Sequence, residues 1–138
     1  MKPKPIRITK TIHASPHELF LAITDPSLIG QWSGQEGIIE PKPGGKASMF
    51  DGWTNGTVVG CKIDRAVAYT WLPAEWEGKW ESSLVQVTLA KVAGGTKLTI
   101  VHSHIPVASE VKSHSTGWHE FFLDPLQEYF DKKLKRKK

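Results

Sequence analysis

Two histidines on one predicted strand are the residues whose spacing most directly suggests chemistry. His102 and His104 are separated by one residue, and such residues point to the same side of an extended strand. An imidazole changes charge near neutral pH, so either ring could act as a general base in an enzyme. Together with His114 or His119, the pair could also form a three-histidine zinc site with an open position.

A metal site is not the favoured interpretation of these histidines. Histidines that bind zinc usually donate their second N–H to a carboxylate, and the strand predicted over residues 96–104 carries no carboxylate. We favour hydrogen-bonded polar groups at the rim of a cavity, with a polar contact to a bound ligand as the functional alternative. We therefore expect no metal and no cofactor.

Other residue types give little reason to expect catalysis. Glu75, Glu77 and Glu81 are clustered, but they lie in a segment with proline and glycine that is typical of a solvated surface rather than of a dry cleft. Cys61 lies in the middle of a predicted strand, where a lone thiol is more often an inert core residue than a nucleophile. No serine stands in a G-x-S-x-G setting. A role other than catalysis is the favoured interpretation.

Tryptophan is abundant, with six in 138 residues, and each indole carries an N–H that needs a partner when it is buried. Trp71 and Trp118 fall in apolar stripes, which favours core packing for each of them. Trp53, Trp76 and Trp80 lie in or beside predicted loops, where aromatic rings more often border a ligand entrance or a partner surface.

The elements that must position these residues begin with a strand and two short helices. Residues 6–13 alternate between apolar and polar types, which predicts a half-buried strand. Ser15, Pro16 and Glu18 form a capping-box pattern that starts a helix. Asp25 before Pro26 ends this helix and can cap a second one that ends near Trp32.

Strands and turns follow between residues 35 and 105. Short connections favour an antiparallel meander, with hairpin turns predicted at Asp51-Gly52 and Asn55-Gly56. Val59, Cys61 and Ile63 are expected on one face of their strand. The predicted strands cover residues 46–50, 57–63, 66–72, 80–91 and 96–104.

The last segment, from Trp118 onwards, has apolar residues at steps of three and four and predicts a long helix, kinked at Pro125. A sheet with one apolar face must cover it, and this helix is the only long amphipathic element available. The sequence therefore predicts an α+β fold in which a curved antiparallel sheet wraps around a long C-terminal helix. A space between sheet and helix would suit a small ligand.

The net charge of +4 invites a nucleic-acid interpretation, but the excess lies at the ends of the chain. Residues 131–138 carry a net charge of +5, whereas residues 5–130 carry −3. No aromatic residues are interleaved with the terminal lysines, as a nucleic-acid-binding segment would require. We therefore interpret these lysines as the solvated end of a helix. We expect one domain over residues 1–138, with residues 1–4 and about 132–138 as basic, flexible ends.

Several short motifs, in the same order along the chain, resemble one known superfamily. The chain is similar to the START-like helix-grip (SRPBCC) superfamily, and within it to the C-terminal domain of the activator of the 90-kDa heat-shock-protein ATPase. The motifs that carry the resemblance are Ala14-Ser15-Pro16 with Glu18 and Phe20, Thr24-Asp25-Pro26 with Trp32, Pro43-Gly44-Gly45, Gly56-Thr57-Val58, Tyr69-Thr70-Trp71, Gly95-Thr96-Lys97-Leu98-Thr99, Val101-His102-Ser103, and Gly117-Trp118 with Leu126.

The resemblance implies a helix-grip fold with a hydrophobic cavity between the sheet and the C-terminal helix. Members of such a superfamily include lipid carriers, cyclases and co-chaperone domains, so three functions stay open. Binding of a small hydrophobic ligand is favoured over a co-chaperone-like interaction module in the stress response and over a cyclase- or dehydratase-type enzyme that uses cavity histidines. The residues expected to bind the ligand are Trp32, Met49, Trp53, Val59, Cys61, Tyr69, Trp71, Val85, Val87, Ile100, His102, His104, Trp118 and Phe122.

Partners and location follow from the same observations. A single cysteine and the lack of a long apolar run favour a cytoplasmic protein without membrane insertion. We expect a monomer or a weak homodimer that binds a small hydrophobic molecule and no nucleic acid. In the co-chaperone alternative, the protein also has a surface that binds a chaperone protein.

Overall fold

Local sequence signals set the first part of the fold. In the computed structural model, which describes residues 3–136, Ser15 Oγ accepts a hydrogen bond from the Glu18 amide at 3.1 Å, and Glu18 Oε1 accepts one from the Ser15 amide at 3.2 Å. This capping box starts the first helix, as the sequence predicted. Asp25 ends that helix and caps the next, because its carboxylate accepts from the Leu28 amide. The two helices are α1 (Pro16–Thr24) and α2 (Pro26–Ser33).

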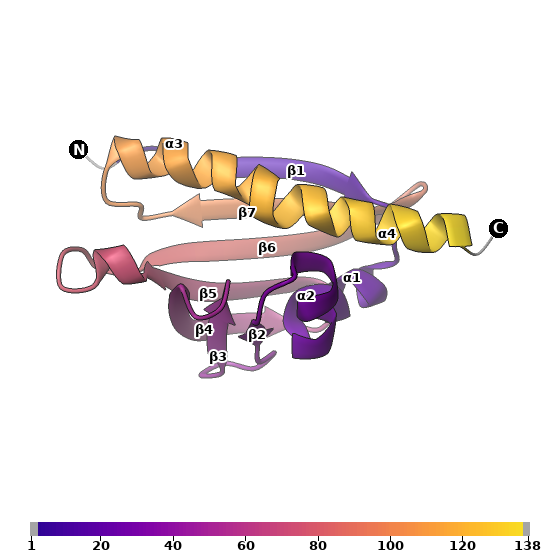
Figure 1. Cartoon of the computed structure of the whole chain (residues 1–138), viewed down its shortest axis with the longest axis horizontal. Coiled ribbons are helices and arrows are strands. Elements are labelled where there is room, and N and C mark those ends of the chain that lie inside the picture. The colour runs from indigo at the N-terminus through magenta and orange to yellow at the C-terminus, as the bar shows by residue number, and fades with distance from the viewer. Residues whose placement is uncertain (1–2, 137–138) are drawn as a thin grey trace.

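Seven antiparallel strands form one sheet in the order β1-β7-β6-β5-β4-β3-β2 (Figure 1). The strand that opens the chain therefore pairs with the last one, and strands β2 to β7 follow each other as the predicted meander. Their bounds are β1 (Ile6–Ile12), β2 (Ile38–Ile39), β3 (Lys46–Met49), β4 (Thr54–Lys62), β5 (Ala66–Pro73), β6 (Ser83–Val92) and β7 (Gly95–Ser103).

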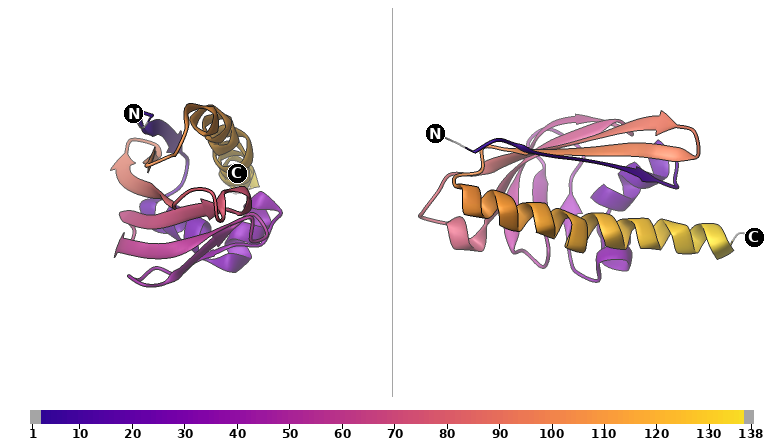
Figure 2. Two further views of the ribbon diagram at one scale, coloured as in Figure 1. Left: turned by 90° about the vertical axis from the view of Figure 1, so that its left-hand side faces the viewer. Right: turned by 90° about the horizontal axis from the view of Figure 1, so that it is seen from above.

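The sheet curves around a long C-terminal helix, which confirms the predicted helix-grip arrangement (Figure 2). The helix runs on without a break through α3 (Ala108–Gly117), a π-helical segment η2 (Trp118–Leu123) and α4 (Asp124–Arg136). The apolar core fills the space between this helix, α1, α2 and the inner face of the sheet. The helix begins before Trp118, ten residues earlier than its apolar stripe indicates.

Pro125 is the second residue after the π-helical segment, and the proline explains the widened turn before it. The amide of Asp124 donates to the carbonyl of His119, five residues earlier rather than the usual four. A proline ring clashes with the carbonyl of the residue four positions before it, and a wider turn relieves this clash. The disturbance expected at Pro125 therefore takes the form of a widened turn that carries Trp118 and Phe121.

The turn predicted at Asp51-Gly52 joins β3 and β4, whereas the one predicted at Asn55-Gly56 is wrong. Asn55 and Gly56 lie inside β4, and the turn is made by Phe50, Asp51 and Gly52, which all have positive φ angles. Gly56 is required for a different reason, because a Cβ atom added there would lie only 1.9 Å from the carbonyl oxygen of Thr70 on β5. Gly56 therefore allows β4 and β5 to approach each other closely and does not form a turn.

A β-bulge in β4 corrects a second expectation. The register against β5 shifts between Val58 and Gly60, so one extra residue is inserted into the alternation. Val58 and Cys61 consequently pack toward the core, whereas Val59 is 55% exposed. The prediction that Val59 and Cys61 share a face is wrong, because alternation with a period of two does not anticipate a bulge.

The basic ends of the chain are described only in part. Residues 132–136 belong to α4, in which Lys132 forms an ion pair with Glu128 at 3.0 Å on the solvent side. Lys2, Lys137 and Lys138 lie outside the described residues. The flexibility expected for both ends stays a prediction.

Candidate ligand-binding pocket

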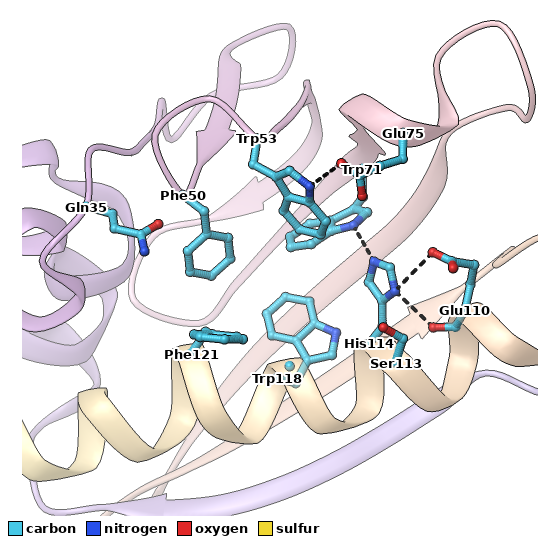
Figure 3. A pocket seen from close by; sticks show the side chains of 11 residues that line it. Gln35, Phe50, Trp53, Trp71, Glu75, Glu110, Ser113, His114, Trp118 and Phe121 are labelled. Carbon is cyan, nitrogen blue, oxygen red and sulfur yellow. Dashed lines mark hydrogen bonds and ion pairs between the residues drawn. The ribbon is translucent and has the colours of Figure 1, made fainter.

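A pocket of about 400 Å³ lies between the C-terminal helix and the inner face of the sheet (Figure 3). Its size falls within the range of known small-molecule sites. Strand β5, the β3–β4 turn, the short helix η1 (Ala74–Trp76), the loop after α2 and the helical segments α3 and η2 all contribute to it. The residues that line it are Gln35, Phe50, Trp53, Trp71, Glu75, Glu110, Ser113, His114, Gly117, Trp118 and Phe121.

Aromatic rings form most of the wall. Trp53 and Trp71 meet edge to face, with ring centroids 6.0 Å apart and planes at 82°. Phe50 lies 6.3 Å from Trp53 and 6.4 Å from Trp71, and Trp118 lies 5.0 Å from Trp71. Tilted and edge-to-face contacts of this kind are favourable and hold the rings in fixed relative positions.

Phe50 reaches the pocket through an uncommon backbone conformation. Its φ angle is +56°, which is costly for a large side chain because the Cβ atom crowds the backbone. The next residue compensates: the Glu36 amide donates to Asp51 Oδ1 at 2.7 Å, and the Asp51 amide donates to the Glu36 carbonyl at 2.9 Å. These two bonds hold the turn in the conformation that presents the Phe50 ring to the pocket.

Two buried histidines hold two of the wall tryptophans. Trp71 Nε1 donates to His114 Nε2 at 3.1 Å, while His114 Nδ1 donates to the Glu110 carbonyl at 2.9 Å. Trp118 Nε1 donates to His102 Nδ1, also at 3.1 Å. The other nitrogen of His102 donates to Ser83 Oγ at 2.7 Å, and that hydroxyl donates to the Trp71 carbonyl at 3.2 Å. Each ring therefore has a defined neutral tautomer.

Burial keeps both imidazoles uncharged. It lowers the pKa of His102 to about 3, with a further contribution from the neighbouring His114. Burial also lowers the pKa of His114, although the Glu110 carbonyl and the carboxylates of Glu110 and Glu75 act in the opposite direction. A neutral imidazole can accept from an indole N–H, whereas a protonated one cannot. The hydrogen bonds that hold Trp71 and Trp118 in the wall therefore require both imidazoles to be neutral.

Two carboxylates lie at one end of the pocket, where the helix and η1 face each other (Figure 3). Glu75 Oε1 accepts from Trp53 Nε1 at 2.6 Å. Glu110 Oε1 accepts from Trp76 Nε1 at 2.8 Å. Each carboxylate is therefore anchored by a neutral indole donor, which fixes its position without cancelling its charge.

Three of the residues predicted to bind a ligand line the pocket, namely Trp53, Trp71 and Trp118. Cys61 is half-buried against the core, whereas Val59 and His104 lie at the surface, away from the pocket. The others form the core behind and beside the pocket wall. These buried residues are Trp32, Met49, Tyr69, Val85, Val87, Ile100, His102 and Phe122.

The histidines do not meet the requirement of the enzyme hypothesis. His102 is fully buried, and both of its ring nitrogens are occupied by Trp118 and Ser83. His104 does not share a face with it: this residue follows the end of β7, has a φ angle of +62° and is exposed. Within residues 3–136, no three histidine, cysteine or acidic side chains come together in a way that could hold a metal ion.

Other pocket residues were missed or set aside by sequence reasoning. Glu75 is exposed, as predicted, but nothing in its local sequence shows that the helix passes opposite it and makes it part of the pocket. Phe50 was missed since its direction depends on the positive φ of the turn. Trp76, expected at an entrance, is fully buried beneath the pocket. The lining residues that the sequence did not predict as ligand contacts are Gln35, Phe50, Glu75, Glu110, Ser113, His114, Gly117 and Phe121.

Comparison with known proteins places these features in a wider group. The sequence profile described as "Activator of Hsp90 ATPase homolog 1-like protein" matches residues 13–131. No curated protein sequence matches the chain significantly. None of the helices within residues 3–136 combines the length and apolar character needed to cross a membrane.

Solved structures with the same fold cover nearly the whole chain. An HSP90 activator from Plasmodium falciparum is 26% identical, with a TM-score of 0.78 over 88% of this chain and 92% of that one. A protein from Mesorhizobium loti is 24% identical, with a TM-score of 0.79 over 94% and 98% of the two chains. An Aha1 dimer from Colwellia psychrerythraea is 20% identical, with a TM-score of 0.76 over 93% and 96%.

Proposed function

This chain belongs to the family of Activator of Hsp90 ATPase homolog 1-like proteins, and on that premise we propose that its pocket binds a small, largely apolar molecule. The observation that carries the proposal is a cavity of about 400 Å³ whose aromatic walls are held in place by hydrogen bonds from Trp53, Trp71 and Trp118. Rigid apolar walls with few polar groups are the usual make-up of small-molecule sites.

Gly117 supports this proposal because it keeps space free in the pocket. Gly117 lies in a continuous helix and has ordinary helical angles (φ −62°, ψ −38°). At such a position a glycine makes the helix less stable than an alanine does, by about 0.5–1 kcal/mol. No steric contact requires a glycine, since an added Cβ atom would meet only Phe121 Cδ2, at 3.9 Å. Glycine at this position therefore makes the helix less stable than alanine would. The space that a side chain would fill is part of the pocket, because Gly117 is one of its lining residues.

Replacing Gly117 with leucine is expected to fill the pocket without unfolding the protein. Aromatic and aliphatic compounds of different charge that change the tryptophan fluorescence of the wild type should bind the variant at least about tenfold more weakly, because the new side chain occupies their space. Thermal unfolding of Gly117→Leu should occur at or above the wild-type temperature, since helix propensity improves.

Gly30→Leu is the matched control. Gly30 lies in α2, outside the pocket, and a Cβ atom there has no neighbour within 4 Å. This variant should bind the same compounds as the wild type. If no compound of the panel binds the wild type, or if both variants bind equally well, the pocket is not a ligand site.

A chaperone partner is the second candidate function. It is favoured by the likeness to the HSP90 activator of Plasmodium falciparum, which covers 88% of this chain. The purified protein should then bind an Hsp90 chaperone at micromolar concentration in a calorimetric titration. Gly117→Leu changes a pocket side chain and should bind the chaperone as the wild type does. Lack of binding by the wild type would exclude this function.

A further inference from the structure

We propose that the ligand of this pocket carries a positively charged amino group, which lies against Glu75 and Glu110 while its apolar part fills the aromatic end. This inference rests on the proposed function, namely that the pocket binds a small molecule. It adds the chemical class of that molecule, which is an amphiphilic aromatic or aliphatic amine rather than a neutral lipid or an acid.

The charge of the lining is one-sided. Among residues 3–136, the lining includes two acidic residues, Glu75 and Glu110, and no lysine or arginine. The only ring between them that could carry a positive charge is His114, whose Nε2 accepts from Trp71 and therefore holds no proton. An anionic ligand would face both carboxylates without a compensating cation.

Both carboxylates retain capacity for a further partner. One oxygen of each accepts from an indole, Trp53 for Glu75 and Trp76 for Glu110. The second oxygen of each has no hydrogen-bond partner within residues 3–136. Within the same residues, neither carboxylate pairs with a lysine or arginine, and the contact of Glu110 with the neutral His114 is 3.9 Å long. Two fixed, uncompensated negative charges thus border one cavity.

Aromatic faces next to these carboxylates favour the same ligand chemistry. The Trp53 indole is bonded to Glu75 and stacks on His114 with centroids 6.0 Å apart, so a cation beside Glu75 lies next to an indole ring. Ring faces carry negative electrostatic potential and attract ammonium groups.

The pocket has one charged end and one apolar end, and this difference fixes the orientation of the ligand. Phe50 and Phe121 lie at the end opposite to the one with Glu75 and Glu110, and Trp71 and Trp118 lie between them (Figure 3). Glu75 is exposed and Glu110 is partly exposed, so an amino group bound there keeps some of its water. The bound cation therefore avoids full desolvation, which is the main obstacle to binding a charge in an apolar pocket.

Three naphthalene compounds of similar size and different charge test this inference by calorimetric titration. They are 1-naphthylmethylamine, which is cationic, 1-naphthalenemethanol, which is neutral, and 1-naphthoic acid, which is anionic. The wild type should bind the amine about three- to tenfold more tightly than the alcohol, and the acid most weakly. In the double variant Glu75→Gln/Glu110→Gln the preference for the amine should disappear, while the affinity for the alcohol changes less than about twofold.

Glutamine suits this test because its side-chain oxygen can still accept from Trp53 and Trp76, so the wall should remain in place. Glu77→Gln is the matched control, since it removes the same charge two residues from Glu75 at an exposed position outside the pocket. It should leave the preference for the amine intact.

The outcomes separate this inference from the function on which it rests. Equal binding of amine and alcohol by the wild type, or an equal effect of Glu77→Gln, would overturn the amine preference and leave the apolar pocket standing. If neither compound binds, and Gly117→Leu behaves as the wild type, the ligand-binding function itself fails and the amine preference fails with it.

Discussion

Replacing Trp118 with alanine is expected to lower the free energy of unfolding by about 3–5 kcal/mol. The ring is 3% exposed and packs against Trp71 and Phe122, with centroids 5.0 and 5.2 Å away. Its removal opens a cavity in the wall and leaves the fully buried Nδ1 atom of His102 without a donor. Since small domains are stable by only about 5–15 kcal/mol, this is a large share of the total.

A cycle of variants separates the two contributions. Trp118→Phe keeps much of the apolar area but removes the indole N–H, and the unpaired His102 acceptor should cost about 1–3 kcal/mol. His102→Leu removes the acceptor, so the double variant should be less destabilised than the sum of the two single ones. Urea denaturation followed by far-UV circular dichroism measures the four proteins of this cycle and Trp118→Ala. A loss below about 1 kcal/mol for Trp118→Ala would show that the wall does not depend on this ring.

The second large effect is a loss of stability in mildly acidic solution. His102 has a pKa of about 3 in the folded protein and a usual value near 6.5 when unfolded. Below pH 6.5 the unfolded chain therefore binds a proton that the folded one excludes, so stability falls as the pH falls. Between pH 7 and pH 5 the loss from His102 should be about 2 kcal/mol, and it should continue toward pH 3. His114 adds to it, since its pKa is also lowered.

Urea denaturation at intervals between pH 7 and pH 5 tests this expectation. The window lies above the range in which aspartate and glutamate side chains usually take up protons. His102→Gln offers one acceptor to Trp118 and one donor to Ser83 but does not titrate, so its stability should vary less with pH than that of the wild type. His104→Gln makes the same change at an exposed position and is the matched control. Parallel pH profiles for the wild type and His102→Gln would contradict a neutral, buried His102.

The sequence predicts the elements of this fold well, because the signals that form them are local. The capping box at Ser15 and Glu18, the shared cap at Asp25 and the alternation in β1 each depend on neighbouring residues. The order of these elements then leaves few ways to cover one face of an antiparallel sheet. The helix-grip arrangement follows from those two steps.

The pocket is less predictable, because its geometry depends on departures from regular structure. A bulge turns Val59 outward, and a positive φ angle turns Phe50 inward. Another positive φ angle separates His104 from His102. Glu75 and Glu110 are far apart in sequence and meet the same cavity only because η1 and α3 face each other. Residue type and spacing do not encode contacts of this kind.

The widened turn at Trp118–Leu123 also bears on how such a pocket can change over generations. A π turn contains one more residue than the α-helical turn that it replaces. Deletion of one residue from it, for example the exposed Glu120, together with a replacement of Pro125 that removes its ring clash, would restore a regular helix while α3 and α4 keep the faces that they present to the sheet. The aromatic residues at the pocket would be redistributed in the same event. A one-codon deletion that is accompanied by loss of the proline could thus give related proteins a new cavity lining on an unchanged scaffold.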